Sequence, residues 1–240
     1  GSFPAVVDVA AGSSSAEVVA ATQAAVSDFR TEHGKNPVVV VVPGVAVFAA
    51  GKDAAAATNA LAVFTDALRV TRDADRIGKV RVMDDAQRSF IENWEAEAYR
   101  QKVAAGAHAG ALTGKIIVVT GGAQGFGLGI ATELLADGAT VILADLNLPG
   151  AQAAADRLAE TYGTRVAAAG VNVADEQSQL DLAYEIVRRY GGLDVFVSNA
   201  GVVRSDGVMT QPVADFDVVT NVNYKGYFLG VRAVAPVMAA

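Results

Sequence analysis

The 240-residue sequence contains no cysteine and only two histidines. The absence of cysteine excludes disulfides, thiolate metal sites and cysteine nucleophiles. His33 and His108 are too few and too far apart in the sequence to predict a histidine-rich zinc site, so we expect no metal. Basic residues are also scarce, because 19 Lys and Arg stand against 26 Asp and Glu and give a formal net charge of -7. We therefore expect no nucleic-acid partner, which would require a concentrated basic face.

Long hydrophobic runs and targeting signals are missing as well. The longest apolar runs, 38–42 and 45–50, are far shorter than the ~20 residues that span a bilayer, and Pro43-Gly44 separates them. We interpret both runs as buried strands and expect no membrane role. No basic segment precedes an apolar core near the N-terminus, so we expect a cytoplasmic protein. Apolar residues nevertheless make up 52% of the chain, which is enough for a sizeable core.

Apolar periodicity divides the chain into two regions. The first is predicted to hold helices at 16–30, 53–73 and 84–104 around the two short strands. The helix at 53–73 would bury a face that includes Ala57, Leu61, Phe64 and Leu68. The segment 105–113, AGAHAGALT, has no period and is interpreted as a linker.

From residue 114 onward, strands alternate with helices. Strands are predicted at 115–120, 140–145, 165–171 and 194–198, and helices at 128–137, 151–162, 176–190 and from about 213 to the end. Such alternation predicts an α/β fold in which a parallel sheet is doubly wound, with helices on both faces.

An apolar strand runs into a glycine-rich turn at 116–127, IIVVTGGAQGFG, and the turn opens a helix. A diphosphate needs backbone N–H donors at a helix N-terminus, where the helix dipole also favours negative charge. Side chains at Gly121, Gly125 or Gly127 would obstruct that approach or the packing of helix on strand. A glycine-rich turn alone is often an ordinary loop, but the flanking strand and helix favour a dinucleotide site.

Asp145 ends the next strand, 18 positions after Gly127. An acid ~20 residues beyond such a turn binds ribose hydroxyls in dinucleotide-binding folds. The alternative is that Asp145 caps the following helix or only sits in a turn. A carboxylate here would repel a 2'-phosphate, and neither Gln124 nor Leu146 and Asn147 supplies a compensating cation. We therefore expect NAD rather than NADP.

These motifs resemble those of the short-chain dehydrogenase/reductase family. Thr120-Gly121-x-x-x-Gly125-x-Gly127 resembles the family's TGxxxGxG loop, and Asn199-Ala200-Gly201 resembles its NNAG motif with Ser198 in place of the first Asn. Asn172-Val173 corresponds to the family's usual Asp-Val, and 222–226 resembles its VNxxG segment. The resemblance covers roughly residues 112–240.

The resemblance implies a Rossmann-type fold and a function for each motif. The implied cofactor-binding residues are Thr120, Gly121, Gln124, Gly125, Phe126, Gly127, Asp145, Leu146, Asn172, Val173, Asn199, Ala200 and Gly201. Asn199 would also stabilise the sheet, Asn172 would meet the adenine, and Asn223 would be a catalytic residue that joins a proton relay through water. The implied reaction is NAD-dependent hydride transfer on a small-molecule secondary alcohol or ketone, and the implied assembly is a homo-oligomer.

Residues 37–100 and the junction after them resemble the bifunctional aldolase/short-chain dehydrogenases, in which a class II aldolase/adducin-like region precedes the dehydrogenase. The implied domains are a smaller α/β aldolase-like region at 1–104, a linker at 105–113 and a truncated NAD-binding domain at 114–240. Residues 223–238 also resemble sugar- and polyol-phosphate dehydrogenases, which implies a sugar, polyol or sugar phosphate as substrate.

The family's chemistry requires a Tyr with a Lys four residues later, together with an upstream Ser. None of the six tyrosines has a Lys at that spacing. We therefore expect a fragment that is inactive alone, with the catalytic Ser, Tyr and Lys beyond Ala240. One alternative is a nucleotide-binding module without chemistry, and another is a lyase activity supplied by residues before Gly1. Arg204 and Asp206 either face the substrate or belong to a surface loop.

The last predicted helix is apolar on more than one side. Its apolar residues include Val222, Phe228, Leu229, Val231, Val234, Val237 and Met238. An exposed apolar patch of this kind is rarely left bare in water. We therefore expect the chain to oligomerise or aggregate through this helix.

Overall fold

The computed structural model describes residues 4–78, 80, 81, 83, 84, 86, 87, 90 and 110–239. The chain divides into two compact units, Gly1–Ala107 and His108–Ala240. Most of the helix predicted at 84–104, including Trp94, and most of the linker predicted at 105–113 lie outside the described residues. The domain boundaries inferred from the sequence therefore stay a prediction.

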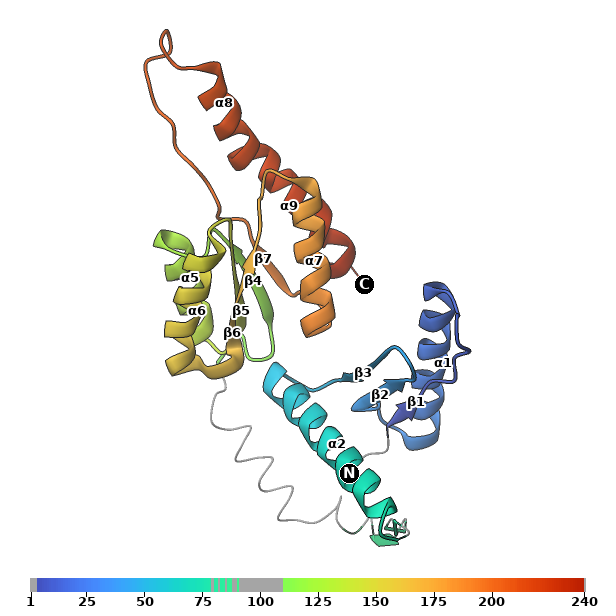
Figure 1. The fold of residues 1–240 in the computed structure, drawn as a ribbon. Coiled ribbons are helices and arrows are strands. Elements are labelled where there is room, and N and C mark those ends of the chain that lie inside the picture. The colour runs from blue at the N-terminus through green and yellow to red at the C-terminus, as the bar shows by residue number, and fades with distance from the viewer. Residues whose placement is uncertain are drawn as a thin grey trace. The chain divides into compact units, whose positions relative to one another are not determined.

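The N-terminal unit contains a three-stranded sheet in the order β1-β2-β3 (Figure 1). β1 (Ala5–Val6) pairs in parallel with β2 (Val39–Val42), which pairs antiparallel with β3 (Ala46–Ala49). Helix α1 (Ser15–His33) begins with a capping box and ends at a left-handed glycine. Helix α2 (Ala54–Asp75) begins at an aspartate whose carboxylate accepts a backbone N–H bond. Local capping chemistry therefore defines where both helices start.

The sequence prediction of a buried face on α2 is wrong. None of the residues of α2 is buried, and Leu61 and Leu68 are 39% and 50% exposed. On β3, Phe48 is 50% exposed, so the second apolar run is not a buried strand. A helical apolar stripe is buried only where another layer covers it, and the described sheet of this unit is small. β1 was missed because two residues are too short to show alternation.

The C-terminal unit is a parallel sheet in the order β6-β5-β4-β7. Its strands are β4 (Ile116–Thr120), β5 (Thr140–Asp145), β6 (Val166–Gly170) and β7 (Val195–Val197). Its helices include α5 (Gly125–Ala136), α6 (Leu148–Tyr162), α7 (Glu176–Tyr190), α8 (Val213–Thr220) and α9 (Gly226–Met238). α5 and α6 cover one face of the sheet, and α7 and α9 cover the other (Figure 1). The predicted doubly wound α/β fold is confirmed.

Burial on both faces explains why the strands of this unit are continuously apolar. Every residue of β4 is buried. Ile117 and Val119 pack toward α5 and α6, whereas Ile116 and Val118 belong to the cluster that includes α7 and α9. At the amino edge of the sheet, the Asp194 carboxylate accepts bonds from the Lys115 ammonium and the Ile116 N–H, each at 2.8 Å. These two bonds hold the start of β7 against β4.

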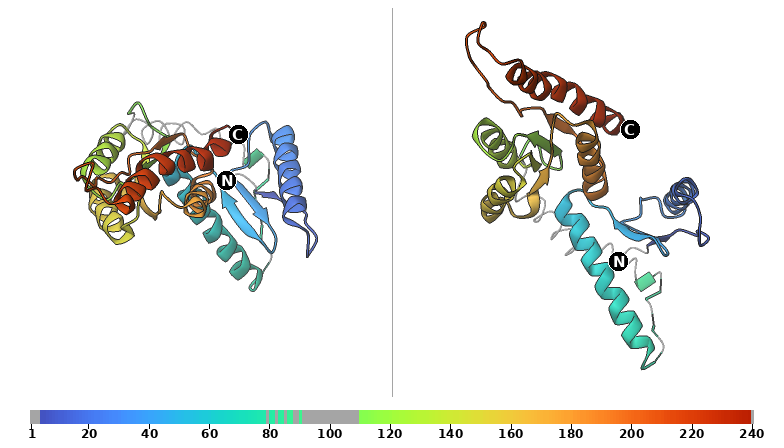
Figure 2. Two further views of the ribbon diagram at one scale, coloured as in Figure 1. Left: turned by 90° about the horizontal axis from the view of Figure 1, so that it is seen from above. Right: turned by 45° about the horizontal axis from the view of Figure 1, so that its top comes forward.

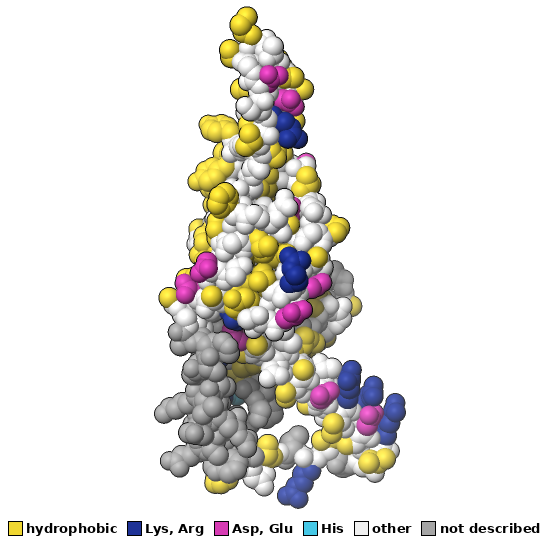
Figure 3. Space-filling view, turned by 90° about the vertical axis from the view of Figure 1, so that its left-hand side faces the viewer, with side chains coloured by type: hydrophobic (Ala, Val, Ile, Leu, Met, Phe, Trp, Pro, Cys, Tyr) yellow, Lys and Arg dark blue, Asp and Glu magenta, His cyan; other side chains and the backbone are white. Residues whose placement is uncertain are grey.

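The final helical segment differs from the single helix predicted for it. A π-helical turn, Asn221–Lys225, separates α8 from α9, and Figure 2 shows the two helices following one another as one rod. The prediction that the last helix is apolar on more than one side is confirmed. Leu229 and Val234 are buried, whereas Phe228 and Val231 are 57% and 42% exposed. Apolar side chains are also exposed at the top of Figure 3, over the loop after β7 and α8. No described helix is both long enough and apolar enough to cross a membrane.

Candidate cofactor site at the carboxyl edge of the sheet

The strand order places a topological switch point between β4 and β7. The chain moves from β4 outward through β5 to β6 and then returns to add β7 on the other side of β4. In open α/β sheets, ligands bind outside the carboxyl ends of the strands at such a point. All four predicted cofactor motifs start at these ends or two residues beyond them, at 120–127, 145–146, 172–173 and 199–201. The fold therefore brings the predicted residues to one edge of the sheet.

Thr120 joins the two segments that flank the switch point. Its buried hydroxyl accepts bonds from the N–H groups of Asn199 (3.0 Å) and Ala200 (3.1 Å) and donates to the Val197 carbonyl (3.2 Å). The Asn199 side-chain amide donates in return to the Thr120 carbonyl at 2.9 Å. The sheet-stabilising role implied for Asn199 thus has a geometric basis.

The glycine-rich turn adopts a conformation that larger residues disfavour. Gly121 and Gly125 have φ values of +66° and +57°, which lie in the left-handed region. A Cβ on Gly127 would overlap the Gly121 carbonyl oxygen, so α5 packs directly against the turn. A Cβ on Gly125 would meet nothing within 4 Å and would project into open space beside the turn. A ligand can therefore approach the backbone closely at this point.

The N-terminus of α5 is left open to an anion. Gln124 occupies the N-cap position of α5, but its side chain makes no capping bond. By contrast, Asn147 caps α6 with a bond to the Gly150 N–H, and Asp175 caps α7. α5 also has no acidic residue in its first turn. The uncapped N–H groups of a helix start, together with the dipole, provide what a diphosphate requires.

Asp145 is the last residue of β5 and is hydrogen-bonded to the glycine-rich turn. Its carboxylate accepts one bond from the Ala123 N–H at 3.0 Å and one from the Asn147 N–H at 2.9 Å. Each oxygen keeps a further lone pair that can accept a hydroxyl. The alternative that Asp145 caps α6 is wrong, because Asn147 does so, although Asp145 does hold a turn.

The remaining predicted residues lie at the same edge and make fewer contacts with the rest of the chain. Phe126 and Leu146 are 90% and 77% exposed, so both are open to contact with a ligand. The side-chain Oδ1 of Asn172 accepts the Ala174 N–H at 3.1 Å, which leaves the side-chain N–H groups of Asn172 as donors. Val173 is partly buried next to α9.

Asn223 lies within the π-helical turn and binds the loop that follows β7. Its Oδ1 accepts the Val202 N–H, and its Nδ2 donates to the Val202 carbonyl, both at 2.9 Å. Sequence reasoning proposed Asn223 but not Val202 or the π turn, since Val202 contributes only main-chain groups. Arg204 and Asp206 are exposed in the same loop, and Asp206 bonds the Gly207 N–H.

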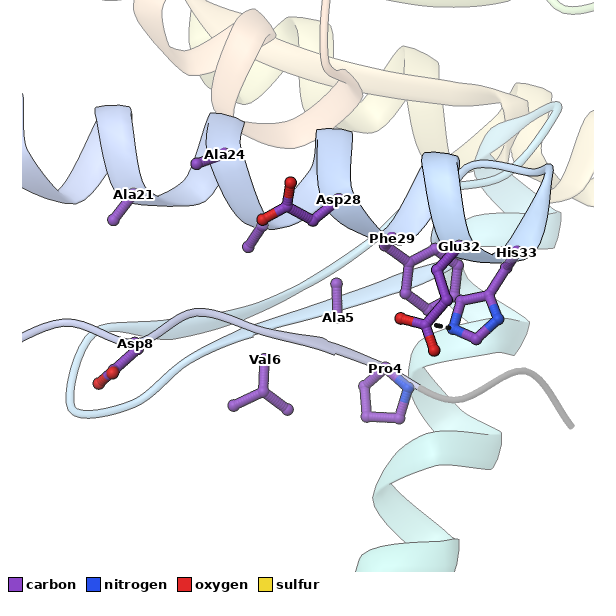
Figure 4. A pocket seen from close by; sticks show the side chains of 11 residues that line it. Pro4, Ala5, Val6, Asp8, Ala21, Ala24, Asp28, Phe29, Glu32 and His33 are labelled. Atoms are coloured by element: carbon purple, nitrogen blue, oxygen red, sulfur yellow. Dashed lines mark ion pairs between the residues drawn. The ribbon is translucent and has the colours of Figure 1, made fainter.

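An open groove of about 920 Å³ lies in the N-terminal unit between β1 and α1 (Figure 4). Asp8, Asp28 and Glu32 lie along it, and His33 approaches Glu32 at 3.9 Å. None of the predicted cofactor residues lines it. Across the described ranges, no group of three or more His, Cys, Asp or Glu is placed to hold a metal ion.

Comparisons with known proteins match both units. The family model for the short chain dehydrogenase matches residues 115–240, and the model for the second domain of class II aldolases matches residues 20–100. The uncharacterized oxidoreductase YuxG of Bacillus subtilis (strain 168) is 29% identical over 197 residues, which are 82% of this chain and 28% of YuxG. That length exceeds either unit, so the match to YuxG includes parts of both.

Other relatives match about half of the chain. The uncharacterized oxidoreductase Mb1385 of Mycobacterium bovis is 40% identical over 127 residues, 53% of this chain and 51% of Mb1385. The RhlG/NADP active-site complex of Pseudomonas aeruginosa superposes with a TM-score of 0.50 and 28% identity over 54% of this chain and 50% of that one. The chain thus spans 28% and 51% of the two sequence relatives. Because the short chain dehydrogenase model matches more than half of the residues, and the strand order and glycine-rich turn agree with it, the protein belongs to the short-chain dehydrogenase family.

Proposed function

We propose that the protein is an NAD-dependent oxidoreductase acting on a secondary alcohol or ketone, and that this chain supplies the cofactor site. The observation that carries the proposal is the Asp145 carboxylate, which ends β5 and bonds the Ala123 N–H of the glycine-rich turn. One carboxylate thereby stands next to both the site for ribose hydroxyls and the site for a diphosphate. The resemblance of 223–238 to sugar- and polyol-phosphate dehydrogenases supports a sugar, polyol or sugar phosphate as substrate.

Each segment of the carboxyl edge has a defined task in this proposal. The open N–H groups at the start of α5 bind the diphosphate, and Asp145 accepts bonds from the ribose hydroxyls. Thr120 and Asn199 hold the turn against the loop after β7, and Asn223 holds that loop at Val202. The bound nicotinamide supplies the hydride chemistry. The residues of this chain therefore bind the cofactor and orient it.

The charge of Asp145 supports NAD over NADP. A 2'-phosphate bound at the adenosine ribose would lie against this carboxylate, and like charges 4 Å apart repel by about 1–4 kcal/mol at dielectric constants of 80 to 20. The RhlG neighbour is an NADP complex, and the proposal of NAD for this chain rests on the charge of Asp145 and not on that neighbour.

We assign cofactor binding, and not turnover, to this chain. None of its six tyrosines is followed by Lys at the fourth position, so no Tyr-Lys pair for proton transfer is present. Thermal unfolding with NADH and with NADPH tests the proposal. NADH at a hundredfold excess over its Kd should stabilise the chain by about 2.7 kcal/mol. A shift with NADPH alone would overturn the assignment of NAD.

We also propose that the chain forms a homo-oligomer through α9. Exposed apolar residues recur at helical spacing from the π-helical turn into α9, at Tyr224, Tyr227, Phe228 and Val231. Contiguous exposed apolar patches of this kind mark association surfaces. Light scattering should give a mass above one chain for the native protein and a lower mass for Phe228→Glu. A clean native monomer would contradict this part of the proposal.

A further inference from the structure

Gln179 is a polar side chain buried in the core of the C-terminal unit. It lies on α7 and is 2% exposed. Its Oε1 is the one buried side-chain oxygen or nitrogen in the described part of the chain that lacks a hydrogen-bond partner. A buried polar atom without a partner lowers stability, so the bonds made by the amide nitrogen of the same side chain must offset that cost. The groups that this nitrogen binds therefore indicate what the side chain does.

The other end of the Gln179 amide joins two segments of the carboxyl edge. Nε2 donates to the Val173 carbonyl at 3.1 Å and to the Gly226 carbonyl at 3.2 Å. Val173 belongs to the loop after β6, and Gly226 directly follows the π-helical turn. These two carbonyls lie 53 residues apart in the sequence (226 − 173 = 53), and one buried amide bonds both of them.

Two glycines of α9 allow this close approach. A Cβ on Gly226 would lie 3.1 Å from the Val173 carbonyl oxygen, and a Cβ on Gly230 would lie 2.8 Å from the Phe196 ring. The same Gly230 Cβ would lie 3.4 Å from the Gln179 amide nitrogen. α9 is thus packed tightly onto Gln179, and the contact leaves little room for adjustment.

The bonded path continues from Gly226 to the loop after β7. The Gly226 N–H donates to the Asn221 carbonyl and closes the π turn that contains Asn223. Asn223 in turn holds both main-chain groups of Val202. Gln179 therefore stands at the point where the loop at 172–173, the π turn and the loop at 199–202 become connected.

We propose that Gln179 is a positioning residue that fixes the π turn, and through Asn223 the loop at 199–202, relative to the loop at 172–173. In functional terms the inference rests on the proposed cofactor site, because residues of both loops are among those expected to contact the cofactor. The structural part of the inference does not depend on the cofactor site, since it concerns how firmly the loops are held in the free protein.

The test compares Gln179→Leu and Gln179→Met with Gln177→Leu. Gln177 lies on the same helix, but it is exposed and its side chain bonds only the Asp181 carboxylate among the described residues. Gln177→Leu therefore makes the same chemical change without removing a buried contact. Hydrogen exchange at the Val202 N–H, measured without cofactor, should be about 5- to 10-fold faster in both Gln179 variants. The denaturation midpoint should fall only modestly, because removal of the unpartnered oxygen offsets part of the loss of the two donated bonds. The Kd for NADH should rise about 5-fold.

Three results would overturn the inference. One is Val202 exchange at the native rate in both Gln179 variants. Another is a large fall of the denaturation midpoint in both, or failure of both to fold, which would show a structural role only. The third is Val202 exchange that is accelerated equally in Gln177→Leu. If the native chain fails to bind NADH, the proposed function fails, while the Val202 measurement still decides the role of Gln179.

Discussion

Replacing Asp145 by Asn removes a charge while keeping the shape of the side chain. The carboxylate accepts the N–H groups of Ala123 and Asn147 with different oxygens. An Asn side chain has one acceptor oxygen, and its NH2 group would face one of these donors. Asp145→Asn therefore breaks one of the two backbone bonds and removes the charged acceptor for the ribose hydroxyls.

The size of the effect follows from hydrogen bonds to a charged group, which contribute about 1.5–3 kcal/mol. Loss of one such bond to the ribose corresponds to a rise of about 10- to 100-fold in the Kd for NADH. The Kd for NADPH should stay level or fall, because a repulsion of about 1–4 kcal/mol disappears with the charge. The ratio of the Kd for NADPH to the Kd for NADH therefore falls by at least the factor by which the Kd for NADH rises.

Isothermal titration calorimetry with each cofactor measures these constants. Asp156→Asn is a suitable control, since Asp156 is an exposed carboxylate on α6 that bonds the Gln152 side chain at 2.8 Å. The control should bind both cofactors as the native chain does. Native NADH affinity in Asp145→Asn would refute the placement of the ribose at this carboxylate.

Three further predictions concern the supports of the site. Gly127→Ala places a Cβ against the Gly121 carbonyl and should cost about 1–3 kcal/mol in urea unfolding while weakening NADH binding; native values for both would refute the packing argument. Thr120→Val leaves two backbone N–H groups without an acceptor and should destabilise the chain by about 2–5 kcal/mol, and an unchanged urea midpoint would contradict this. Burial acts to raise the pKa of Asp194, but bonds from Lys115 and a backbone N–H outweigh it and hold that pKa below its ordinary value. The stabilisation is therefore present above the unfolded pKa and lost as pH falls through the folded one. Asp194→Asn should be less stable than the native chain at neutral pH, with a gap that closes in acid; a gap independent of pH would count against it.

The elements of the C-terminal unit could be predicted because local sequence and tertiary packing agree there. The strand ending at Thr120 is buried on both faces, so its apolar run needs no period to be recognised. The helix after residue 175 was predicted with the observed bounds, since Asp175 caps it and Gly191 ends it in a left-handed conformation. The α5 helix begins three residues earlier than predicted, at Gly125, because glycines give little propensity signal for a helix start.

The rest depends on contacts that sequence spacing does not encode. The apolar stripe of α2 was assigned to a core, but whether a stripe is covered depends on which layer reaches it. The bond between Asp145 and the Ala123 N–H joins segments 22 residues apart and involves a main-chain group, which no residue type announces. Gln179 gave no signal either, since a single Gln on a helix is ordinarily exposed.

The central claim is that backbone N–H groups of the glycine-rich turn bind the cofactor's diphosphate. Backbone amide chemical shifts of the 15N-labelled chain, recorded with and without saturating NADH, test it most directly. We predict that the largest changes fall on residues 121–127, with a second group next to Asp145. Binding of NADH that leaves the amide signals of 121–127 unmoved would contradict the account.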